Sequence, residues 1–267
     1  MLNQSLPRSA SHAPQRNTTP VSSDRTAGLD GQSRRVKPLM RRYEIVHLTP
    51  SSDIDDMTRI APAIPLFENC FAAIGRGAIV TTDAGPCAVE DLWPGDRVMT
   101  TSHGMMQLLW KGCMQIVPGT QNANPEMGTM TRLTQDALGY RKPNADVVLG
   151  PAARIAHRHN MSKRLSGDEV SFILARDFID QSAIVELHPA TAVDVYQLGF
   201  REHASIIIGG GLEIESLHPG LPHLLKLRND GRELLMSMFP HMEQLGDFGP
   251  LLHPRLHLRD LDLSSIT

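Results

Sequence analysis

Two positions in this chain carry side chains suited to chemistry. The first is Cys70, a thiol that follows the polar, acidic step Glu68-Asn69 and precedes a run of short apolar segments. The second is His157-x-His159, which places two imidazoles on one face of a strand and could bind a metal ion. Because no third ligand is visible near this pair, an exposed loop edge is the favoured interpretation. The plain alternative for Cys70 is a buried cysteine in an ordinary β-meander.

The residues after Cys70 predict antiparallel β-structure. Short apolar, partly β-branched stretches are separated by turn residues at regular spacing. Each break combines Gly with Asp, Ser or Pro, residues that supply the backbone angles of tight turns. Pro94-Gly95 suits the middle of a type II turn, so Leu92 and Val98 should face the core. The predicted strands of this stretch lie at residues 78–82, 87–89, 97–101 and 106–110. Further strands are predicted at 43–49, 113–117 and 129–134, on both sides of a Gly-Pro break within 146–156, and at 184–187, 194–200, 204–208 and 212–216.

The sequence resembles the Hedgehog/intein (Hint) domain family, and its bacterial branch most closely. After Cys70, the residues Ile79, Thr81 and Gly85 match the opening of the family in order, and Gly75 or Gly77 stands near the family glycine. The acidic and turn segments Glu90-Asp91-Leu92 and Pro94-Gly95-Asp96 continue the match. A second block comprises Val195-Tyr196-Gln197-Leu198, Glu202-His203 and the segment 211–216. The resemblance implies a mostly β, horseshoe-like Hint domain over residues 67–220.

The resemblance also implies an activity at Cys70. In a Hint domain the first cysteine adds to the carbonyl of the preceding residue, here Asn69, and the amide becomes a thioester that a second nucleophile cleaves. A positioned histidine assists the proton transfer. By this resemblance Cys70 is the nucleophile, Asn69 supplies the scissile carbonyl, and His203 could transfer the proton. A structural histidine in a β-turn is the alternative for His203.

Two departures from the family pattern leave the activity open. Where the family carries a hydroxyl and a histidine in its second block, this chain has Gly150 and Ala153. Where inteins end in His-Asn, this chain has Glu215-Ser216, so protein splicing is not expected. The first hypothesis is self-processing at Asn69–Cys70, with the chain's own N-terminal segment as substrate. The second is an inactive Hint module that acts as a binding or structural domain.

The chain divides into four predicted parts. Residues 1–42 are rich in Ser, Pro, Arg and Gln without apolar periodicity, and are expected to form a disordered tail. Residues 43–66 are an extended lead-in, residues 67–220 the Hint-like domain and residues 221–267 a C-terminal extension. The prolines at 62 and 65 favour an extended rather than helical segment over 60–67. Residues 171–179 fit a strand or a short helix, and residues 224–238 predict two short helices separated by Asn229-Asp230-Gly231.

Composition excludes several kinds of partner. The net charge is -3, which offers no electrostatic basis for binding nucleic acid or an anionic membrane. No apolar run is long enough to span a bilayer. The three cysteines have no metal-ligand spacing and their odd number does not suggest a disulfide framework, so a reduced, cytoplasmic protein is expected. No cofactor or metal is predicted, and the sequence does not indicate an oligomeric state.

Overall fold

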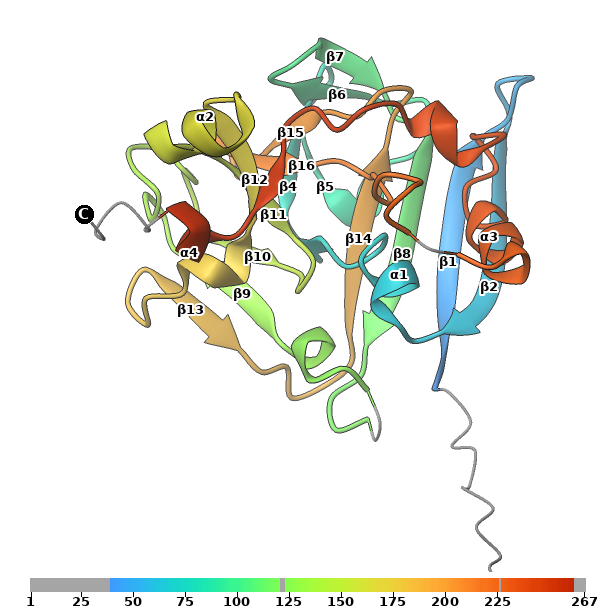
Figure 1. Cartoon of the computed structure of the whole chain (residues 1–267), viewed down its shortest axis with the longest axis horizontal. Helices are drawn as coiled ribbons and strands as arrows, with labels where there is room; N and C mark the ends of the chain where they lie inside the picture. Colours follow the sequence, from blue (N-terminus) through green and yellow to red (C-terminus); the bar gives the residue numbers. More distant parts are fainter. Residues whose placement is uncertain (1–38, 121–122, 226, 262–267) are drawn as a thin grey trace, which may run out of the picture. The chain divides into compact units, whose positions relative to one another are not determined.

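The structure is a computed structural model that describes residues 39–120, 123–225 and 227–261. Most of the predicted tail, residues 1–38, lies outside the described residues. The remaining tail positions are not separate from the fold, because the first strand begins at Met40. The predicted mostly β fold is confirmed, with two sheets and a few short helices (Figure 1). The lead-in, the Hint-like region and the described part of the extension belong to one compact unit.

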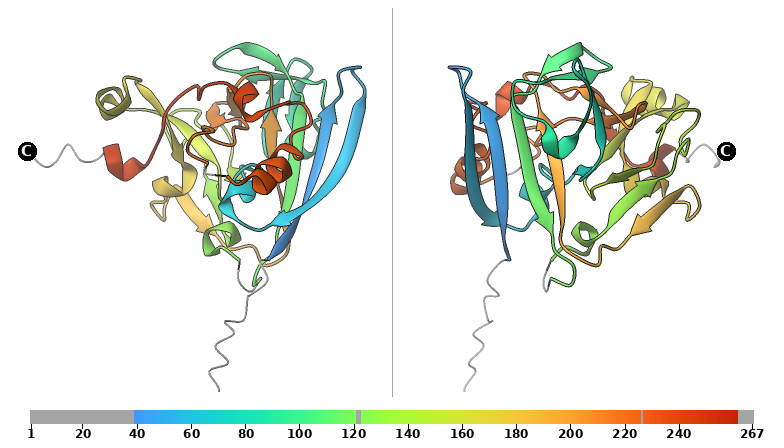
Figure 2. Two further views of the ribbon diagram at one scale, coloured as in Figure 1. Left: turned by 45° about the vertical axis from the view of Figure 1, so that its right-hand side comes forward. Right: turned by 180° about the vertical axis from the view of Figure 1, so that it is seen from behind.

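The first sheet is eight-stranded, and all of its neighbouring strands are antiparallel. Its central strands β14, β8 and β1 lie side by side and are seen well from behind in Figure 2. In spatial order the strands are β13 (Ile184–Leu187), β9 (Met130–Leu133), β10 (Val147–Leu149), β3 (Ile74–Gly75), β14 (Val193–Gly199), β8 (Trp110–Ile116), β1 (Met40–Leu48) and β2 (Ile54–Pro62).

The second sheet is nine-stranded, and its only parallel pair among the described residues joins β12 to β17. That pair brings the C-terminal extension into the sheet. In spatial order the strands are β17 (Arg255–Leu256), β12 (Val170–Leu174), β11 (Arg154–Arg158), β16 (Leu212–Glu215), β15 (Ser205–Ile208), β4 (Ile79–Thr82), β6 (Arg97–Thr100) and β7 (Gly104–Gln107), with β5 (Gly85–Ala88) paired to β4.

The helices are short and connect or cover the sheets. The α-helices are α1 (Pro65–Glu68), α2 (Asn160–Ser166), α3 (Asn229–Met236) and α4 (Leu258–Leu261). The 3-10 helices are η1 (Val89–Asp91), η2 (Pro125–Gly128), η3 (Ala175–Phe178) and η4 (Leu245–Phe248). Among the described residues no helix is sufficiently long and apolar to traverse a membrane.

Three local predictions were wrong. Pro65 does not keep its segment extended, because a proline is well tolerated at the first position of a helix and α1 begins there. Asn229-Asp230-Gly231 does not separate two helices but opens α3, since polar residues of this kind suit a helix N-terminus. The predicted strand over residues 106–110 is split between β7 and β8.

The turn after Trp93 is confirmed. Gly95 has a φ of 107°, a value that favours glycine, and the amide of Asp96 donates to the carbonyl of Trp93 at 3.0 Å. The Asp96 carboxylate accepts from the Trp93 amide at 2.8 Å and closes the turn. Leu92 and Val98 are both fully buried, as predicted, but only Val98 lies in a strand (β6), because Leu92 directly follows the 3-10 helix η1. The ambiguous stretch 171–179 divides into β12 and the 3-10 helix η3.

The predicted lead-in is a β-hairpin built into the first sheet. β1 pairs with β2 on one side and with β8 on the other, from Tyr43 opposite Met114 to His47 opposite Trp110. Tyr43 and Ile45 alternate inward along β1 and are buried. The hairpin therefore contributes to the hydrophobic core, although it precedes Cys70 in the chain.

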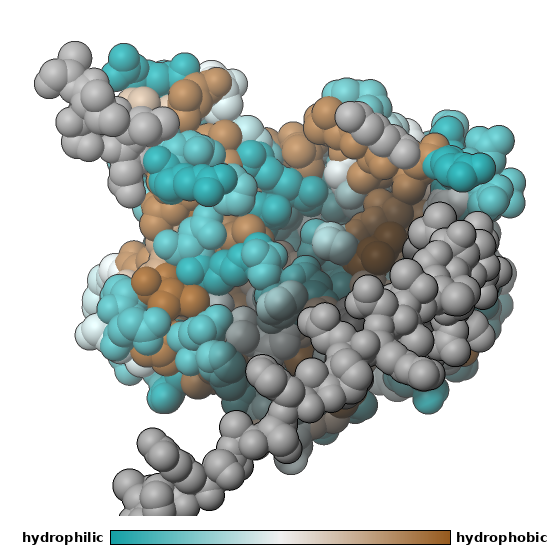
Figure 3. Space-filling view, turned by 60° about the horizontal axis from the view of Figure 1, so that its bottom comes forward, coloured by the Kyte–Doolittle hydropathy of each residue, from teal (hydrophilic) through white to brown (hydrophobic). Residues whose placement is uncertain are grey.

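The C-terminal extension covers a second part of that core. The indole nitrogen of Trp110 donates to the Met238 carbonyl at 2.8 Å, and the Trp110 and Phe239 rings are 5.5 Å apart. Phe239 in turn packs edge-on against Phe248 at 5.3 Å. One hydrophobic cluster thus contains residues from the hairpin, from the Cys70 region and from the extension. At the surface, Figure 3 shows hydrophobic side chains in separate patches between hydrophilic ones.

Candidate functional site

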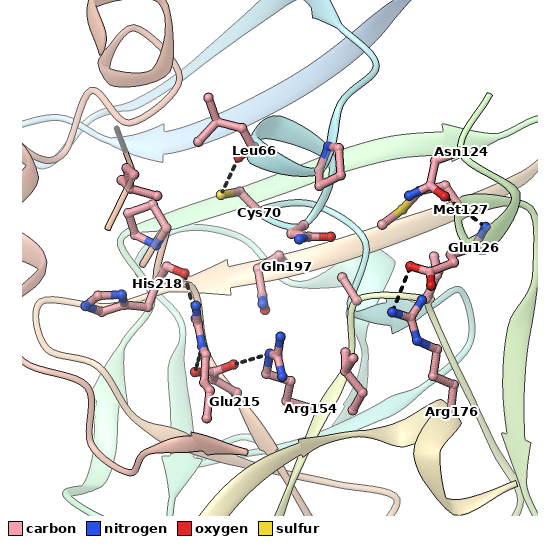
Figure 4. A pocket seen from close by; sticks show the side chains of 18 residues that line it. Leu66, Cys70, Asn124, Glu126, Met127, Arg154, Arg176, Gln197, Glu215 and His218 are labelled. Carbon is pink, nitrogen blue, oxygen red and sulfur yellow. Dashed lines mark hydrogen bonds and ion pairs between the residues drawn. The ribbon is translucent and has the colours of Figure 1, made fainter. Parts of the chain in front are cut away.

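Cys70 is held immediately after α1. Asn69 is the C-cap of this helix, and the Cys70 amide donates to the Phe67 carbonyl at 3.0 Å. The Cys70 thiol is 3% exposed and donates to the Leu66 carbonyl at 3.5 Å (Figure 4). The next residue, Phe71, is fully buried and fixes the direction of the chain after the thiol. The side chain of Cys70 is therefore placed by one helical turn and one aromatic anchor.

Asn69 and Cys70 both line a cavity of about 220 Å³, and Asn69 is solvent-exposed at this position. In Figure 4 the Cys70 sulfur lies on one side of the cavity and Glu215 and Arg154 on the other, with Gln197 between them. The lining contains many polar side chains, including three arginines. Its polar members are Asn69, Cys70, Asn124, Glu126, Arg154, Arg176, Gln197, Glu215, His218 and Arg255.

Glu215 is the centre of the charged wall. It ends β16, and the antiparallel pairing of Ile214 with Ile155 sets it beside Arg154 of β11. Its carboxylate lies 3.6 Å from the Arg154 Nε and 2.8 Å from the Arg255 Nε, so two guanidinium groups share one carboxylate. Arg255 comes from β17 in the extension and also donates to the His218 carbonyl at 2.7 Å. Three separate chain segments therefore build this wall.

His203 lies behind Glu215 and does not line the cavity that holds Cys70. Its Nδ1 accepts from the Leu252 amide at 2.9 Å, so Nε2 is the ring nitrogen that can donate. That Nε2 is 3.2 Å from Oε1 of Glu215. The structure thus brings Asn69 and Cys70 together at one cavity and connects His203 to it indirectly, through Glu215 and through the His218 ring 4.9 Å away.

His218 is the histidine that lines the cavity, and both of its ring nitrogens are engaged. Nδ1 accepts from the Gly220 amide at 3.0 Å, so Nε2 carries the proton and donates to the Gly249 carbonyl at 3.2 Å. Burial, and then the neighbouring His203, lower the pKa of His218 to about 4. This imidazole is neutral at physiological pH and is a poor proton donor for a leaving group.

Electrostatics distinguish the thiol from the carboxylate. Burial raises the pKa of the Cys70 thiol to about 12, while Arg255 lowers it and Glu215 raises it by smaller amounts. Burial alone would also raise the pKa of Glu215, but Arg255, His203 and Arg154 outweigh it and lower that pKa to about 2. At neutral pH the site therefore holds a protonated thiol beside an ionised glutamate.

This arrangement supplies some of the parts of an acyl-transfer site. Charged guanidinium groups and amide donors can stabilise negative charge on a carbonyl oxygen, and Arg154, Arg255 and Gln197 line the cavity. Gln197 is 5% exposed, and its side-chain oxygen accepts from the Leu198 amide at 2.9 Å. A general acid for the leaving nitrogen is missing from this wall, because Glu215 is ionised and His218 is neutral.

The positions that depart from the family pattern lie beside the chain segment after Cys70. The amides of Gly150 and Ala152 donate to the carbonyls of Ala73 and Ala72, both at 2.8 Å. A Cβ on Gly150 would overlap the Ala72 carbonyl, so a hydroxyl side chain does not fit there without backbone movement. Ala153 is buried in a second hydrophobic cluster, which also contains Ile155, Ile206 and Ile214, whereas Ala152 lines the cavity.

His157 and His159 do not take part in the cavity. Their rings stack 6.1 Å apart, and the His157 ring packs edge-on against Phe178 at 5.2 Å. The Nδ1 of His159 accepts from the Met161 amide at 3.1 Å and caps α2, which is a structural role. Within residues 39–120, 123–225 and 227–261 no group of three or more His, Cys, Asp or Glu side chains is placed to hold a metal ion.

Comparison with protein families matches residues 69–221 to the Hint domain, which is more than half of the chain. The chain belongs to the Hint domain family. The match begins at Asn69, one residue before the thiol that lines the cavity. No curated protein matches the sequence. A solved structure of a splice-inactive, GSH-linked variant of the AceL NrdHF class 3 split intein is similar over 55% of this chain and 98% of that chain, at 13% identity and a TM-score of 0.38.

Sequence reasoning missed most of this Hint domain's charged wall. In the sequence Glu215 stands out only as a replacement for the intein ending, and Arg255 lies in a stretch without pattern. Arg255 is also outside the matched residues 69–221, so the extension adds to the site a residue that the family match does not cover. The sequence did contain a signal for Glu215, because this acidic residue follows the apolar Ile214 near the end of a predicted strand. An acidic side chain at such a position is rarely buried unless it is paired with a positive charge.

Proposed function

We propose that this Hint domain cleaves its own chain between Asn69 and Cys70. The Cys70 sulfur adds to the Asn69 carbonyl carbon, and the bond from that carbon to the Cys70 nitrogen breaks as the nitrogen takes up the proton lost by the thiol. The product is a thioester with a free amine at Cys70. Water or a thiol then attacks the thioester, releases the Asn69 acyl group and regenerates the Cys70 thiol.

The observation that carries this proposal is the shared cavity. Asn69 and Cys70 stand at the start of the family match and face a wall that holds Arg154, Arg255 and Gln197. These groups suit the oxyanion of the addition step. Because the thiol is protonated and donates to Leu66, and because a general acid is lacking on the wall, the reaction should be slow.

A second function is favoured by a different observation. The family histidine is replaced by Ala153, and a hydroxyl at position 150 would overlap Ala72. A chain that has lost these groups could keep the Hint fold as a binding or structural module without cleaving itself. This alternative predicts a chain that stays intact under all conditions.

Intact-mass spectrometry of the purified full chain distinguishes self-cleavage from the inactive module. We expect pieces corresponding to residues 1–69 and 70–267 to accumulate slowly, and faster with dithiothreitol or hydroxylamine, which resolve thioesters. Cys70→Ala should abolish the cut, whereas the matched changes Cys87→Ala and Cys113→Ala should leave it. A wild-type chain that remains intact with both reagents would reject self-processing and support the module.

The setting of this reaction is also part of the proposal. Cys70, Cys87 and Cys113 are all free thiols, which supports a reducing compartment such as the cytoplasm. The only substrate proposed is the chain's own N-terminal segment, without a cofactor.

A further inference from the structure

The hairpin formed by β1 and β2 precedes the bond that would be cut, yet it is paired to a strand that follows the cut. β1 joins β8 along the register from Tyr43 opposite Met114 to His47 opposite Trp110. The ladder is extended at one end by the Leu48 amide, which donates to the Leu109 carbonyl at 2.8 Å, and at the other by Arg41, which donates to the Gln115 carbonyl. None of these bonds uses the peptide between Asn69 and Cys70.

Side-chain packing crosses the same boundary. The Tyr43 ring lies 4.7 Å from the Phe71 ring, and the Phe71 ring lies 5.2 Å from the Trp110 ring. Tyr43, Ile45 and Ala61 of the hairpin are each 1% exposed or less. Removing the hairpin would open one face of the hydrophobic cluster and leave one edge of β8 without its partner strand.

We propose that the β1–β2 hairpin remains docked on β8 after the chain is cut, so that processing yields a two-chain protein. The inference rests on the proposed function for the cut itself, whereas the docking surface exists whether or not the cut occurs. A covalent link provides an effective concentration of the order of mM, and the interface must hold the hairpin once that link is lost. A paired strand with buried aromatic and aliphatic side chains is suited to holding the hairpin without a covalent link.

Retention has a consequence for the chemistry at Cys70. Before water or a thiol attacks, the thioester itself keeps Asn69 beside the freed amine of Cys70 and the shift can reverse, so retention of the hairpin matters only after the thioester is resolved. After hydrolysis the new carboxylate of Asn69 would face the wall that carries Arg154 and Arg255. The product would therefore be held by opposite charge as well as by the hairpin.

The test separates docking from cleavage. A protease recognition sequence is inserted between half-buried Ala63 and exposed Ile64, in the short connection from β2 to α1, in the full chain carrying Cys70→Ala. Because this chain cannot cut itself, the added protease makes the only break, and intact-mass analysis of the wild type reports on self-cleavage independently.

We expect the cut hairpin to co-elute with the remainder in a one-to-one ratio on size exclusion at about 1 μM, which requires a Kd of that order or tighter. Hydrogen exchange should still protect the amides of Tyr43–His47. Elution of the hairpin as a separate species, or loss of that protection, would overturn the proposal. Ile45→Asp, or the milder Tyr43→Ala, provides the control in which the cut hairpin should dissociate.

Discussion

Arg255 and Glu215 form the ion pair that joins the C-terminal extension to the cavity of Cys70. The Arg255 Nε lies 2.8 Å from Oε1 of Glu215, whose side chain is 6% exposed. Glu215 lies within the matched Hint region and Arg255 beyond it. The extension is therefore part of the site as well as part of the hydrophobic core.

Removing Arg255 should weaken both stability and the site. In Arg255→Ala the buried Glu215 keeps only Arg154 and His203 as partners, so the free energy of unfolding should fall by about 2 kcal/mol. Urea denaturation measures this change. Arg259→Ala is the matched control, because that side chain is 81% exposed, and it should have almost no effect. Equal losses in the two variants would show that the pair with Glu215 is unimportant.

Restoring an imidazole should accelerate cleavage only where it faces the cavity. Ala152→His places a proton donor at a position that lines the cavity with Cys70, and general acid catalysis contributes about 10²–10⁴-fold in rate. Ala153→His should instead destabilise the fold, because Ala153 is 1% exposed in the other cluster. The measurement is the rate at which residues 70–267 appear by intact mass.

Two results would contradict this prediction about the imidazole. One is cleavage in Ala152→His that persists when Cys70→Ala is added, since the reaction would then not use the thiol. The other is a faster reaction in Ala153→His than in Ala152→His, which would mean that position 153 rather than 152 serves the site.

Gly112 should tolerate no side chain. A Cβ there would overlap the rings of Trp110 and Phe71, which pack against the backbone of β8 at this point. Gly112→Ala should cost about 1–3 kcal/mol or more by overpacking, read from chemical denaturation. Gly128→Ala serves as the comparison, because a Cβ at Gly128 meets no atom within 4 Å. An unchanged midpoint in Gly112→Ala would mean that the aromatic packing is looser than described.

Stability should fall as the pH drops below about 6.5. Burial lowers the pKa of His218 to about 4 and that of His241 to about 3, so between these values and the unfolded pKa of about 6.5 the unfolded chain binds protons that the folded chain does not. In that pH range each of the two histidines lowers the free energy of unfolding by up to about 1.4 kcal/mol for every unit by which the pH falls. Glu215, with a folded pKa of about 2, adds a further loss only below about pH 4.5.

The histidine contribution can be isolated by substitution. His218→Gln should reduce the slope of unfolding free energy against pH between about pH 6.5 and 4, whatever its effect on absolute stability. His188→Gln changes a histidine whose side chain is 73% exposed and should leave the slope as it is. A wild-type stability that does not change over this range would contradict the burial of neutral His218 and His241.

Local sequence determined the β-character of this protein and the position of its thiol. The turn at Gly95 was predictable because glycine with positive φ, a preceding proline and a capping aspartate act within a few residues. The burial of Val98 follows from alternation along β6, which is also local, whereas Leu92 is buried at the end of the 3-10 helix η1. Cys70 and Asn69 could be singled out because the family pattern is carried by a continuous stretch of chain.

Tertiary structure alone decided what surrounds the thiol. Glu215, Arg154 and Arg255 come from β16, β11 and β17, and only the pairing of strands brings their charges together. Whether Ala152 or Ala153 lines the cavity of Cys70 depends on the path of the turn after β10. Two backbone hydrogen bonds, from the amides after β10 to the carbonyls of Ala72 and Ala73, determine that path. Such contacts join residues far apart in the sequence, so short-range propensity and periodicity carry no information about them.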